Sequence, residues 1–231
     1  MSTELCVALD GGNRQWILDM ARLVGDRTEW LKIGLEAFTS FGPDLVERVQ
    51  EAPATVFLDL KLHDIPNTVA RAAASCARLG VGMLNVHASG GERMMRAAVD
   101  AVRAVDSEHV TKVIAVTVLT SLAASDLVAL GHEQPPDDLV LKWAGLAQQS
   151  GLDGVVASAR EAAAIRRVCG PDFLVVTPGI RPVWAAADDQ RRVVTPEDAC
   201  RAGADVLVIG RPITGADDPL EAIARIRGDM L

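Results

Sequence analysis

Residues 55–88 read TVFLDLKLHDIPNTVARAAASCARLGVGMLNVHA, and the elements expected in this segment set the pattern for the rest of the chain. Its two ends, TVFLDL at 55–60 and GMLNVHA at 82–88, are short apolar runs typical of buried strands. Between them, residues 68–79 place apolar side chains at helical spacing. Gly80 then stands where a left-handed helix cap is expected. This strand, helix and second strand predict part of a parallel sheet covered by helices.

The same alternation extends on both sides of this segment. Six further runs have the length and composition of strands: LCVAL at 5–9, WLKIGL at 30–35, KVIAVTVL at 112–119, GVVAS at 154–158, FLVVT at 173–177 and DVLVIG at 205–210. Amphipathic stretches between strands predict helices at 16–23, 43–50, 93–105 and 138–149. Further glycines near helix ends are Gly151, Gly170 and Gly203. Eight strands alternating with helices predict an α/β fold, a (β/α)8 TIM barrel that occupies residues 1–231 as a single domain. An open doubly wound sheet competes, but no GxGxxG motif follows the first strand.

Composition narrows the class of protein. Hydrophobic residues make up 49% of the 231 residues while aromatics are 3% and Tyr is absent, so we expect an aliphatic core. The formal charge of -8 argues against a broad nucleic-acid surface. No apolar run is long enough to span a membrane and no basic segment precedes the first strand, which indicates a soluble, cytoplasmic protein. The four cysteines form no CxxC pair and are expected to be buried free thiols.

The third predicted strand carries charges at its end. Asp59 and Lys61 are two residues apart, so in a regular strand their side chains share a face. A buried carboxylate and ammonium lose hydration, which is tolerable only with close partners or a task for the charge. Asp64 follows just beyond the strand. This segment is therefore either an ion pair or part of a reactive site.

Other polar residues also fall at the C-terminal ends of the predicted strands, where barrel enzymes carry their chemistry. We expect a charged network made of Asp10, Lys32, Asp59, Lys61 and Asp64. Neighbouring carboxylates should keep Lys61 protonated, which suits an ammonium proton donor. The alternative is a structural lattice of ion pairs that fills the mouth of the barrel. Perturbed charges concentrate at functional sites, which favours the first interpretation.

A second group of residues predicts a phosphate site. GIR at 179–181 follows the seventh strand and IGR at 209–211 follows the eighth, which places Arg181 and Arg211 where barrels commonly bind phosphate. Simple turn formation is the alternative for each glycine alone. The long irregular stretch 181–196 suggests a binding loop or lid, and Gln190 within it is a further candidate donor. His87 is expected to be packed or hydrogen-bonded, with no metal bound.

Together these residues resemble the orotidine 5'-monophosphate decarboxylase family in its short bacterial form. The matching motifs span nearly the whole chain: VALD ending at Asp10, LKIG with Lys32, DLKLHDIPNT from Asp59 to Thr68, HASGG from His87, TVLTS with Thr120 and Ser121, TPGIRP with Pro178 and Arg181, DDQRRV with Gln190, and IGRPIT with Gly210 and Arg211. No position expected to function departs from the pattern.

The resemblance implies decarboxylation of orotidine 5'-monophosphate to uridine 5'-monophosphate, the last step of pyrimidine nucleotide synthesis, without metal or organic cofactor. By analogy, Lys61 stabilises and protonates the C6 carbanion while Asp59 and Asp64 hold the lysine and crowd the departing carboxylate. The remaining positions implied to act at the site or to bind substrate are Asp10, Lys32, Ile65, Thr68, Thr120, Ser121, Pro178, Arg181, Gln190, Gly210 and Arg211.

The resemblance also implies a homodimer with shared sites, because the segment of Asp64, Ile65 and Thr68 is expected to reach the partner's site. No nucleic-acid or membrane partner is expected. Two alternatives stay open. One is a magnesium-dependent sugar-phosphate decarboxylase of the same superfamily, which the DIPNT motif and the Gln190 loop disfavour. The other is a barrel that binds a nucleotide without catalysis, which the complete set of charged residues disfavours.

Overall fold

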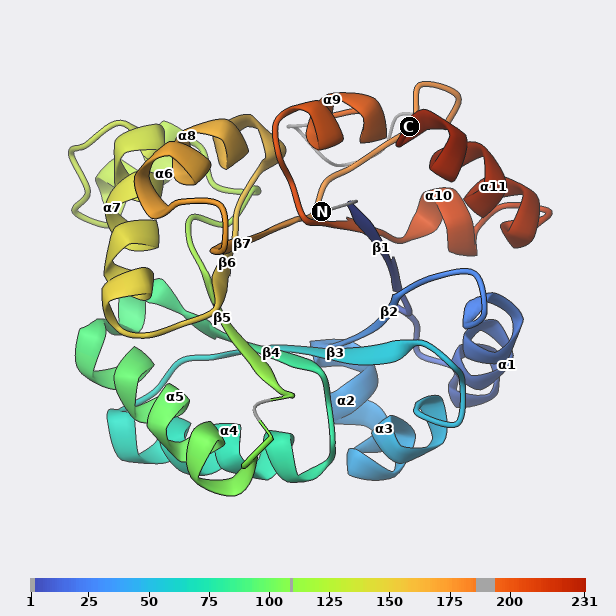
Figure 1. Cartoon of the computed structure of the whole chain (residues 1–231), viewed down its shortest axis with the longest axis horizontal. Helices are drawn as coiled ribbons and strands as arrows, with labels where there is room; N and C mark the ends of the chain where they lie inside the picture. The colour runs from blue at the N-terminus through green and yellow to red at the C-terminus, as the bar shows by residue number, and fades with distance from the viewer. Residues whose placement is uncertain (1–2, 109, 186–193) are drawn as a thin grey trace.

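The computed structural model describes residues 3–108, 110–185 and 194–231. Eight parallel strands pair in chain order and close into a barrel, because β8 pairs with β1 through Glu4 with Val206 and Val7 with Ile209. Figure 1 shows the ring of strands with the helices around its outside. This confirms the predicted TIM barrel. The strands are β1 (Glu4–Ala8), β2 (Trp30–Gly34), β3 (Thr55–Leu62), β4 (Met83–His87), β5 (Lys112–Val116), β6 (Gly154–Val156), β7 (Leu174–Thr177) and β8 (Val206–Ile209).

Helices connect successive strands on the outer side of the ring. They are α1 (Arg14–Val24), α2 (Leu35–Phe41), α3 (Pro43–Val49), α4 (Pro66–Arg78), the short 3-10 helix η1 (Ala88–Gly90), α5 (Glu92–Val105), α6 (Ala124–Ala129), α7 (Pro136–Gln149), α8 (Ala159–Cys169), α9 (Pro196–Arg201), α10 (Arg211–Thr214) and α11 (Pro219–Asp229). The predicted strands match to within a few residues, although β5 ends at Val116 and not at the predicted Leu119. No bounds were predicted for α2, α6, α8, α9, α10 or α11. Four of these, α2, α6, α9 and α10, have only four to seven residues, which show little of a helical period.

Two apolar clusters hold these layers together. The larger one lies between the strands and the helices and is built almost entirely from Val, Leu, Ile, Ala and Met. The smaller one contains Cys6, Ala8, Phe57, Met83, Ile114, Val176, Val206 and Val208. Phe57 is the one aromatic residue among these eight buried side chains, so the expected aliphatic core is confirmed. Alternate strand residues fill a barrel of this size completely, so the chemistry must lie at an end of the barrel.

Backbone geometry confirms the predicted helix ends. Gly80, Gly151, Gly170 and Gly203 have φ of 75°, 84°, 84° and 89°, the left-handed region where a residue without Cβ is favoured. All four cysteines are free thiols, as expected, but Cys200 is only half-buried. Among the described helices, none is long and apolar enough to cross a lipid bilayer.

At the N-terminal end of the barrel, one arginine ties three segments together. The guanidinium of Arg166, on α8, donates hydrogen bonds to the carbonyl oxygens of Pro171 at 2.7 Å, Phe173 at 2.8 Å and Gly203 at 2.9 Å. It also pairs with the carboxylate of Asp205. The loops that lead into β7 and β8 are thereby fixed to the helix, which positions the strands that later carry the cationic side of the site.

Candidate active site

Strand β3 is irregular at the point where its charged residues lie. It pairs with β4 through Leu58 with Leu84, and the next pair is Leu62 with Val86, so four residues on β3 advance against two on β4. Lys61 has φ of 51° and is the one non-glycine residue with positive φ among those described. Such a conformation costs about 1–3 kcal/mol and persists only when surrounding contacts maintain it.

The bulged strand gives rise to a chain of ion pairs. The Lys61 ammonium Nζ lies 2.6 Å from Asp59 Oδ1, and Lys32 Nζ lies 3.4 Å from Asp59 Oδ2. Lys32 also donates a hydrogen bond to Asp10 Oδ1 at 3.0 Å. Four members of the predicted network therefore meet at the C-terminal mouth of the barrel. The sequence analysis attributed the contact between Asp59 and Lys61 to a shared face of a regular strand. In the structure the backbone at Lys61 is irregular, and the β-bulge brings its side chain to Asp59.

Burial sets the electrostatics of the network. The side chains of Lys32 and Asp59 are 9% and 11% exposed, whereas that of Lys61 is 30% exposed. Burial alone would lower the pKa of Lys32, but the carboxylates of Asp59 and Asp10 outweigh it and hold the pKa above its usual value. Burial alone would raise the pKa of Asp59, but the two ammonium groups and two hydrogen bonds hold it below its usual value. Both groups are therefore charged near neutral pH.

Two residues that the sequence did not single out support this network. Asn85, on β4, is 1% exposed, and its amide donates a hydrogen bond to Asp59 Oδ1 at 2.6 Å. Its amide oxygen accepts a hydrogen bond from the backbone N–H of Lys61 at 2.7 Å. Gly34 leaves room, because a Cβ there would lie 3.0 Å from Asp10 Oδ1 and 3.1 Å from Lys32 Nζ. An amide in the middle of an apolar strand was the available signal for Asn85.

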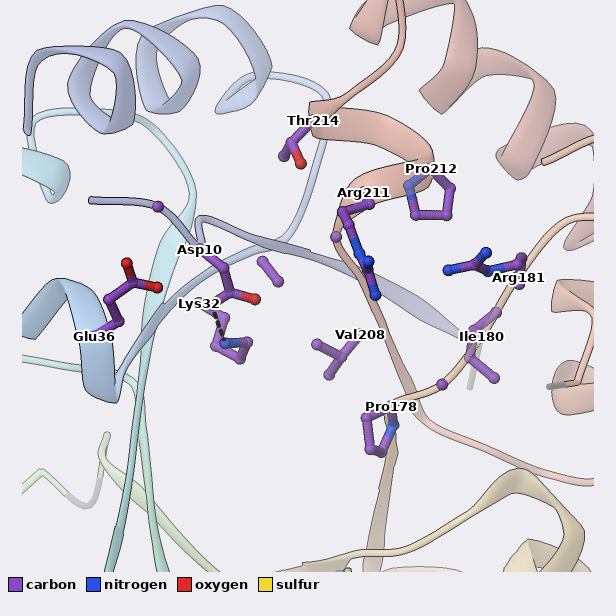
Figure 2. Close-up of a pocket in the computed structure, with 14 residues that line it drawn as sticks. Asp10, Lys32, Glu36, Pro178, Ile180, Arg181, Val208, Arg211, Pro212 and Thr214 are labelled. Carbon is purple, nitrogen blue, oxygen red and sulfur yellow. Dashed lines mark hydrogen bonds and ion pairs between the residues drawn. The ribbon is translucent and has the colours of Figure 1, made fainter. Parts of the chain in front are cut away.

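A cavity of about 310 Å³ opens beside the network. Figure 2 shows Asp10, Lys32 and Glu36 along one side of it and the guanidinium groups of Arg181 and Arg211 along the other. The segment after β1, strand β2 and helix α2 supply the first side, while the segments after β7 and β8 supply the second. A ligand with an anionic end and a hydroxyl-bearing end fits this polarity.

A second cavity of about 170 Å³ adjoins the first, since Lys32, Pro178 and Val208 line both. Lys61 and Asp59 lie on its wall together with Thr120. The rest of its lining is mainly apolar: Phe57, Val116, Val118, Leu119, Val156 and Ala157. A flat ring could lie against this apolar lining and meet the ammonium group of Lys61 at its edge.

The remaining predicted residues lie elsewhere in the chain or outside the described residues. Ser121, Asp64, Ile65 and Thr68 are exposed and do not line either cavity. The Asp64 carboxylate accepts a hydrogen bond from the backbone N–H of Ile65 at 2.6 Å, and within the described residues no ion pair joins it to Lys61. Asp64 therefore does not join the network of its own chain. Gln190 lies in 186–193, outside the described residues.

His87 ends β4 close to the network. Its ring lies 5.5 Å from that of His63, centroid to centroid. Burial, the neighbouring His63 and the Lys61 ammonium lower the pKa of His87, against the opposing effect of Asp59. It is therefore a packed, neutral imidazole near pH 7, consistent with its expected role.

The sequence of this chain matches a known protein family over nearly its full length. A family model described as "Orotidine 5'-phosphate decarboxylase / HUMPS family" matches residues 3–226. This chain belongs to that family. The resemblance inferred from the motifs is thereby confirmed.

Individual members of the orotidine 5'-phosphate decarboxylase / HUMPS family match over the full length. The protein of Pelobacter propionicus named "Orotidine 5'-phosphate decarboxylase" is 50% identical over 228 residues, covering 99% of this chain and 95% of that protein. The protein of the same name from Photobacterium profundum is 50% identical over 230 residues, covering 100% and 99%. A crystal structure of orotidine 5'-phosphate decarboxylase from Lactobacillus acidophilus superposes with a TM-score of 0.86 at 36% identity, covering 99% of both chains.

Proposed function

We propose that this chain converts orotidine 5'-monophosphate to uridine 5'-monophosphate and CO2, as a carboxy-lyase of pyrimidine nucleotide synthesis. One observation carries the proposal: the Lys61 ammonium, held 2.6 Å from Asp59, faces a largely apolar cavity that adjoins the one with two arginines. A nucleotide could place its ring in the apolar cavity beside Lys61 and its phosphate in the cavity with the two arginines. Relatives about 50% identical over nearly the full length carry the name of this activity.

The reaction needs a cation at the carbon that loses CO2. When the C6–CO2 bond breaks, its electron pair stays on C6, and the Lys61 ammonium stabilises that charge before donating a proton to it. Asp59 keeps the ammonium in place, and the partly exposed Lys61 side chain can regain its proton from solvent. The family resemblance assigns Asp64 the task of crowding the departing carboxylate, a contribution that is hard to isolate from charge stabilisation.

Binding is assigned by position in the two cavities. In this proposal Asp10 and Lys32 hold the ribose hydroxyls, and Arg181, Gly210 and Arg211 hold the phosphate; all five residues line the larger cavity. Thr120 and Pro178 line the ring cavity. The family resemblance also implies a contact from Ser121 to the pyrimidine, although Ser121 lines neither cavity, and a contact from Gln190, outside the described residues, to the phosphate. A remote phosphate supplies binding energy that helps orient the reacting ring.

The functional unit is a homodimer with shared sites. Asp64, Ile65 and Thr68 are exposed and do not line the two cavities of their own chain, and Ile65 is 66% exposed. An exposed Ile beside an acidic residue that the reaction calls for is consistent with a segment that enters a partner's site. A cytoplasmic location is inferred with the activity, since pyrimidine nucleotide synthesis draws on cytosolic substrates.

A direct assay tests the activity. Adding pure protein to orotidine 5'-monophosphate should remove the orotidylate absorbance and release one CO2 per uridine 5'-monophosphate formed. The rate should be equal with and without a metal chelator, whereas a magnesium-dependent sugar-phosphate decarboxylase would lose activity with the chelator. Tight binding of the nucleotide without turnover would instead support the non-catalytic alternative.

The phosphate assignment predicts a defect in Arg211→Ala. Loss of a charge-assisted contact should remove about 2–3 kcal/mol of transition-state stabilisation. The value of kcat/KM for the nucleotide should therefore fall roughly 30- to 150-fold. The unphosphorylated nucleoside orotidine should react slowly and equally with both proteins. Arg48→Ala, which removes a surface partner of Glu51, is the matched control and should leave kcat/KM unchanged. Equal kcat/KM of Arg211→Ala and the parent would remove Arg211 from the site.

A further inference from the structure

We propose that Asn85 is a positioning residue that fixes both the backbone of Lys61 and the carboxylate of Asp59. This inference rests on the proposed function, because it assigns a role in the same reaction. Asn85 lies on β4, lines neither cavity and has no direct access to a ligand there. Any effect on turnover must therefore pass through the two residues that it contacts.

Both ends of the Asn85 amide are occupied by members of the network. Nδ2 donates to Asp59 Oδ1 at 2.6 Å, and Oδ1 accepts from the backbone N–H of Lys61 at 2.7 Å. The same Asp59 oxygen accepts from Lys61 Nζ at 2.6 Å. One buried side chain thus contacts the main chain of the lysine and the carboxylate that holds the ammonium of that lysine.

The amide chemistry is specific to this arrangement. Asp59 can only accept while it is ionised, and a backbone N–H can only donate, so the residue between them must offer one donor and one acceptor. An Asp at position 85 would accept from Lys61 but would place a second carboxylate against Asp59. A Leu would fill similar space and make neither hydrogen bond. At 1% exposure, water cannot replace the lost partner without entering the core.

The contact with Lys61 explains how its unusual backbone is maintained. The bulge between Leu58 and Leu62 removes this part of β3 from the regular pairing with β4. The Lys61 N–H would then lack a strand partner, and Asn85 supplies one from the side chain. Because φ of 51° sets the direction in which the side chain leaves the strand, this bond also sets where the ammonium group lies.

The contact with Asp59 adds an electrostatic effect. Lys32 and Lys61 face this carboxylate from β2 and β3, and Asn85 faces it from β4. The buried Cys6 and His87, two residues further along β4, each interact electrostatically with Asp59, and Asp10 acts on it through Lys32. Burial works to raise the pKa of Asp59, and donation from Asn85 is one of the contacts that lower it. Without Asn85, protonation of Asp59 should begin at a higher pH.

Two variants separate these effects from a general loss of structure. In Asn85→Leu, kcat should fall about 10- to 100-fold while KM stays within about twofold, because orientation of the ammonium suffers but the binding cavities do not. The acid limb of the pH profile of kcat should move to higher pH. In Asn85→Asp the acid limb should move further, since a second carboxylate opposes ionisation of Asp59. If Asn85→Leu does not fold, Asn85→Ser replaces it.

Val86→Ala is the matched control for destabilisation. Val86 lies on the same strand and is fully buried in the larger apolar cluster, between the strands and the helices. It should lower the melting temperature without moving the acid limb or kcat. A crystal structure of each Asn85 variant adds a readout independent of turnover, in which φ of Lys61 should leave the positive region.

Three outcomes would overturn the role of Asn85: unchanged kcat in folded variants, a fall in kcat with KM rising in parallel and an unmoved acid limb, or an unchanged Lys61 backbone. Failure of the parent enzyme to turn over would instead overturn the proposed function, and the crystal structures would still decide whether Asn85 positions Lys61.

Discussion

The carboxylate of Asp59 forms ion pairs with two ammonium groups, that of Lys32 at 3.4 Å and that of Lys61 at 2.6 Å. Its side chain is only 11% exposed. A carboxylate in this setting holds both ammonium groups in place, including that of Lys61, the proposed proton donor. Removing one partner from a buried ion pair leaves the other charge without compensation, which costs more than the pair contributes. Lys32 is the more vulnerable partner, since its side chain is 9% exposed and Lys61 reaches solvent.

We therefore predict that Asp59→Asn lowers the free energy of unfolding at pH 7 by about 2–4 kcal/mol. The pKa of Asp59 is lowered in the folded protein, so the stability that its ionised form contributes is fully present above the unfolded value of 3.8. That contribution is lost as pH falls through the folded pKa. The difference between parent and variant should thus be constant from about pH 7 to pH 5 and should shrink below pH 3.8.

Urea unfolding of both proteins at a series of pH values measures this difference. Glu51→Gln, which removes an exposed partner of Arg48, is the control and should change stability by less than about 1 kcal/mol at every pH. A parent-to-variant difference that stays constant down to about pH 3 would show that the ionised carboxylate is not its source.

At this scale the sequence was informative about residue types and silent about conformation. Asp10, Lys32, Asp59 and Lys61 could be predicted to meet, because strand ends of a parallel barrel converge at one rim. The left-handed backbone of Lys61 could not be predicted, because Lys has no preference for that conformation. The contact that maintains it comes from Asn85 on another strand. Asn85 was missed for the same reason: its function depends on a register shift that no periodicity reveals.

Among the elements, α8 has a structural role at the end of the barrel away from the site. Arg166 leaves this helix and contacts the loops that lead into β7 and β8. Without Arg166, the carbonyl groups of Phe173 and Gly203 would lose this hydrogen-bond partner in part-buried positions, whereas that of Pro171 is exposed. Arginine suits the task, because its planar guanidinium donates several hydrogen bonds in fixed directions.

We predict that Arg166→Met reduces the free energy of unfolding by about 2–4 kcal/mol, since several carbonyl groups and Asp205 lose their donor. The value of kcat, measured where the variant is fully folded, should equal that of the parent. Arg167→Met, exposed on the same helix, is the matched control and should change stability by less than about 0.5 kcal/mol. A stability of Arg166→Met equal to that of the control would show that these hydrogen bonds contribute nothing net.

The elements themselves were predictable to different degrees. Strands were recognised because β-branched runs bounded by polar residues are distinctive, and left-handed glycines marked the helix ends. Short helices such as α2 and α10 escaped prediction, although α10 begins with Arg211 and so carries a candidate phosphate ligand. The motif identified the residue there, and only the structure identified the element.

For the whole molecule, the main untested prediction is assembly into a dimer with shared sites. Lys61→Ala and Asp64→Ala should each be inactive alone. In a mixed dimer both substitutions fall in one site, so the other site is complete. Random exchange of equal amounts should therefore restore about one quarter of the parental activity per chain, because half of the dimers are mixed and each has one working site of two.

Native mass spectrometry of the mixture checks that mixed dimers form, and orotidylate turnover measures the recovery. Mixing Lys61→Ala with Asp59→Ala is the matched control: both residues belong to the same chain's network, so no complete site can arise. An inactive first mixture that contains mixed dimers would mean that Asp64 serves its own chain or has no role in the reaction.

The closure of the barrel has a consequence for how this chain folds. Pairing of β1 with β8 joins residues about 200 positions apart, such as Glu4 and Val206, and contacts of such high separation carry a loop-closure cost that slows folding. The cavity with Asp10 and Lys32 on one side and Arg181 and Arg211 on the other straddles this seam. A ligand that touches both sides binds only the closed ring and stabilises it by mass action. The nucleotide pool of the cell would then influence how much of the newly made chain reaches its native state.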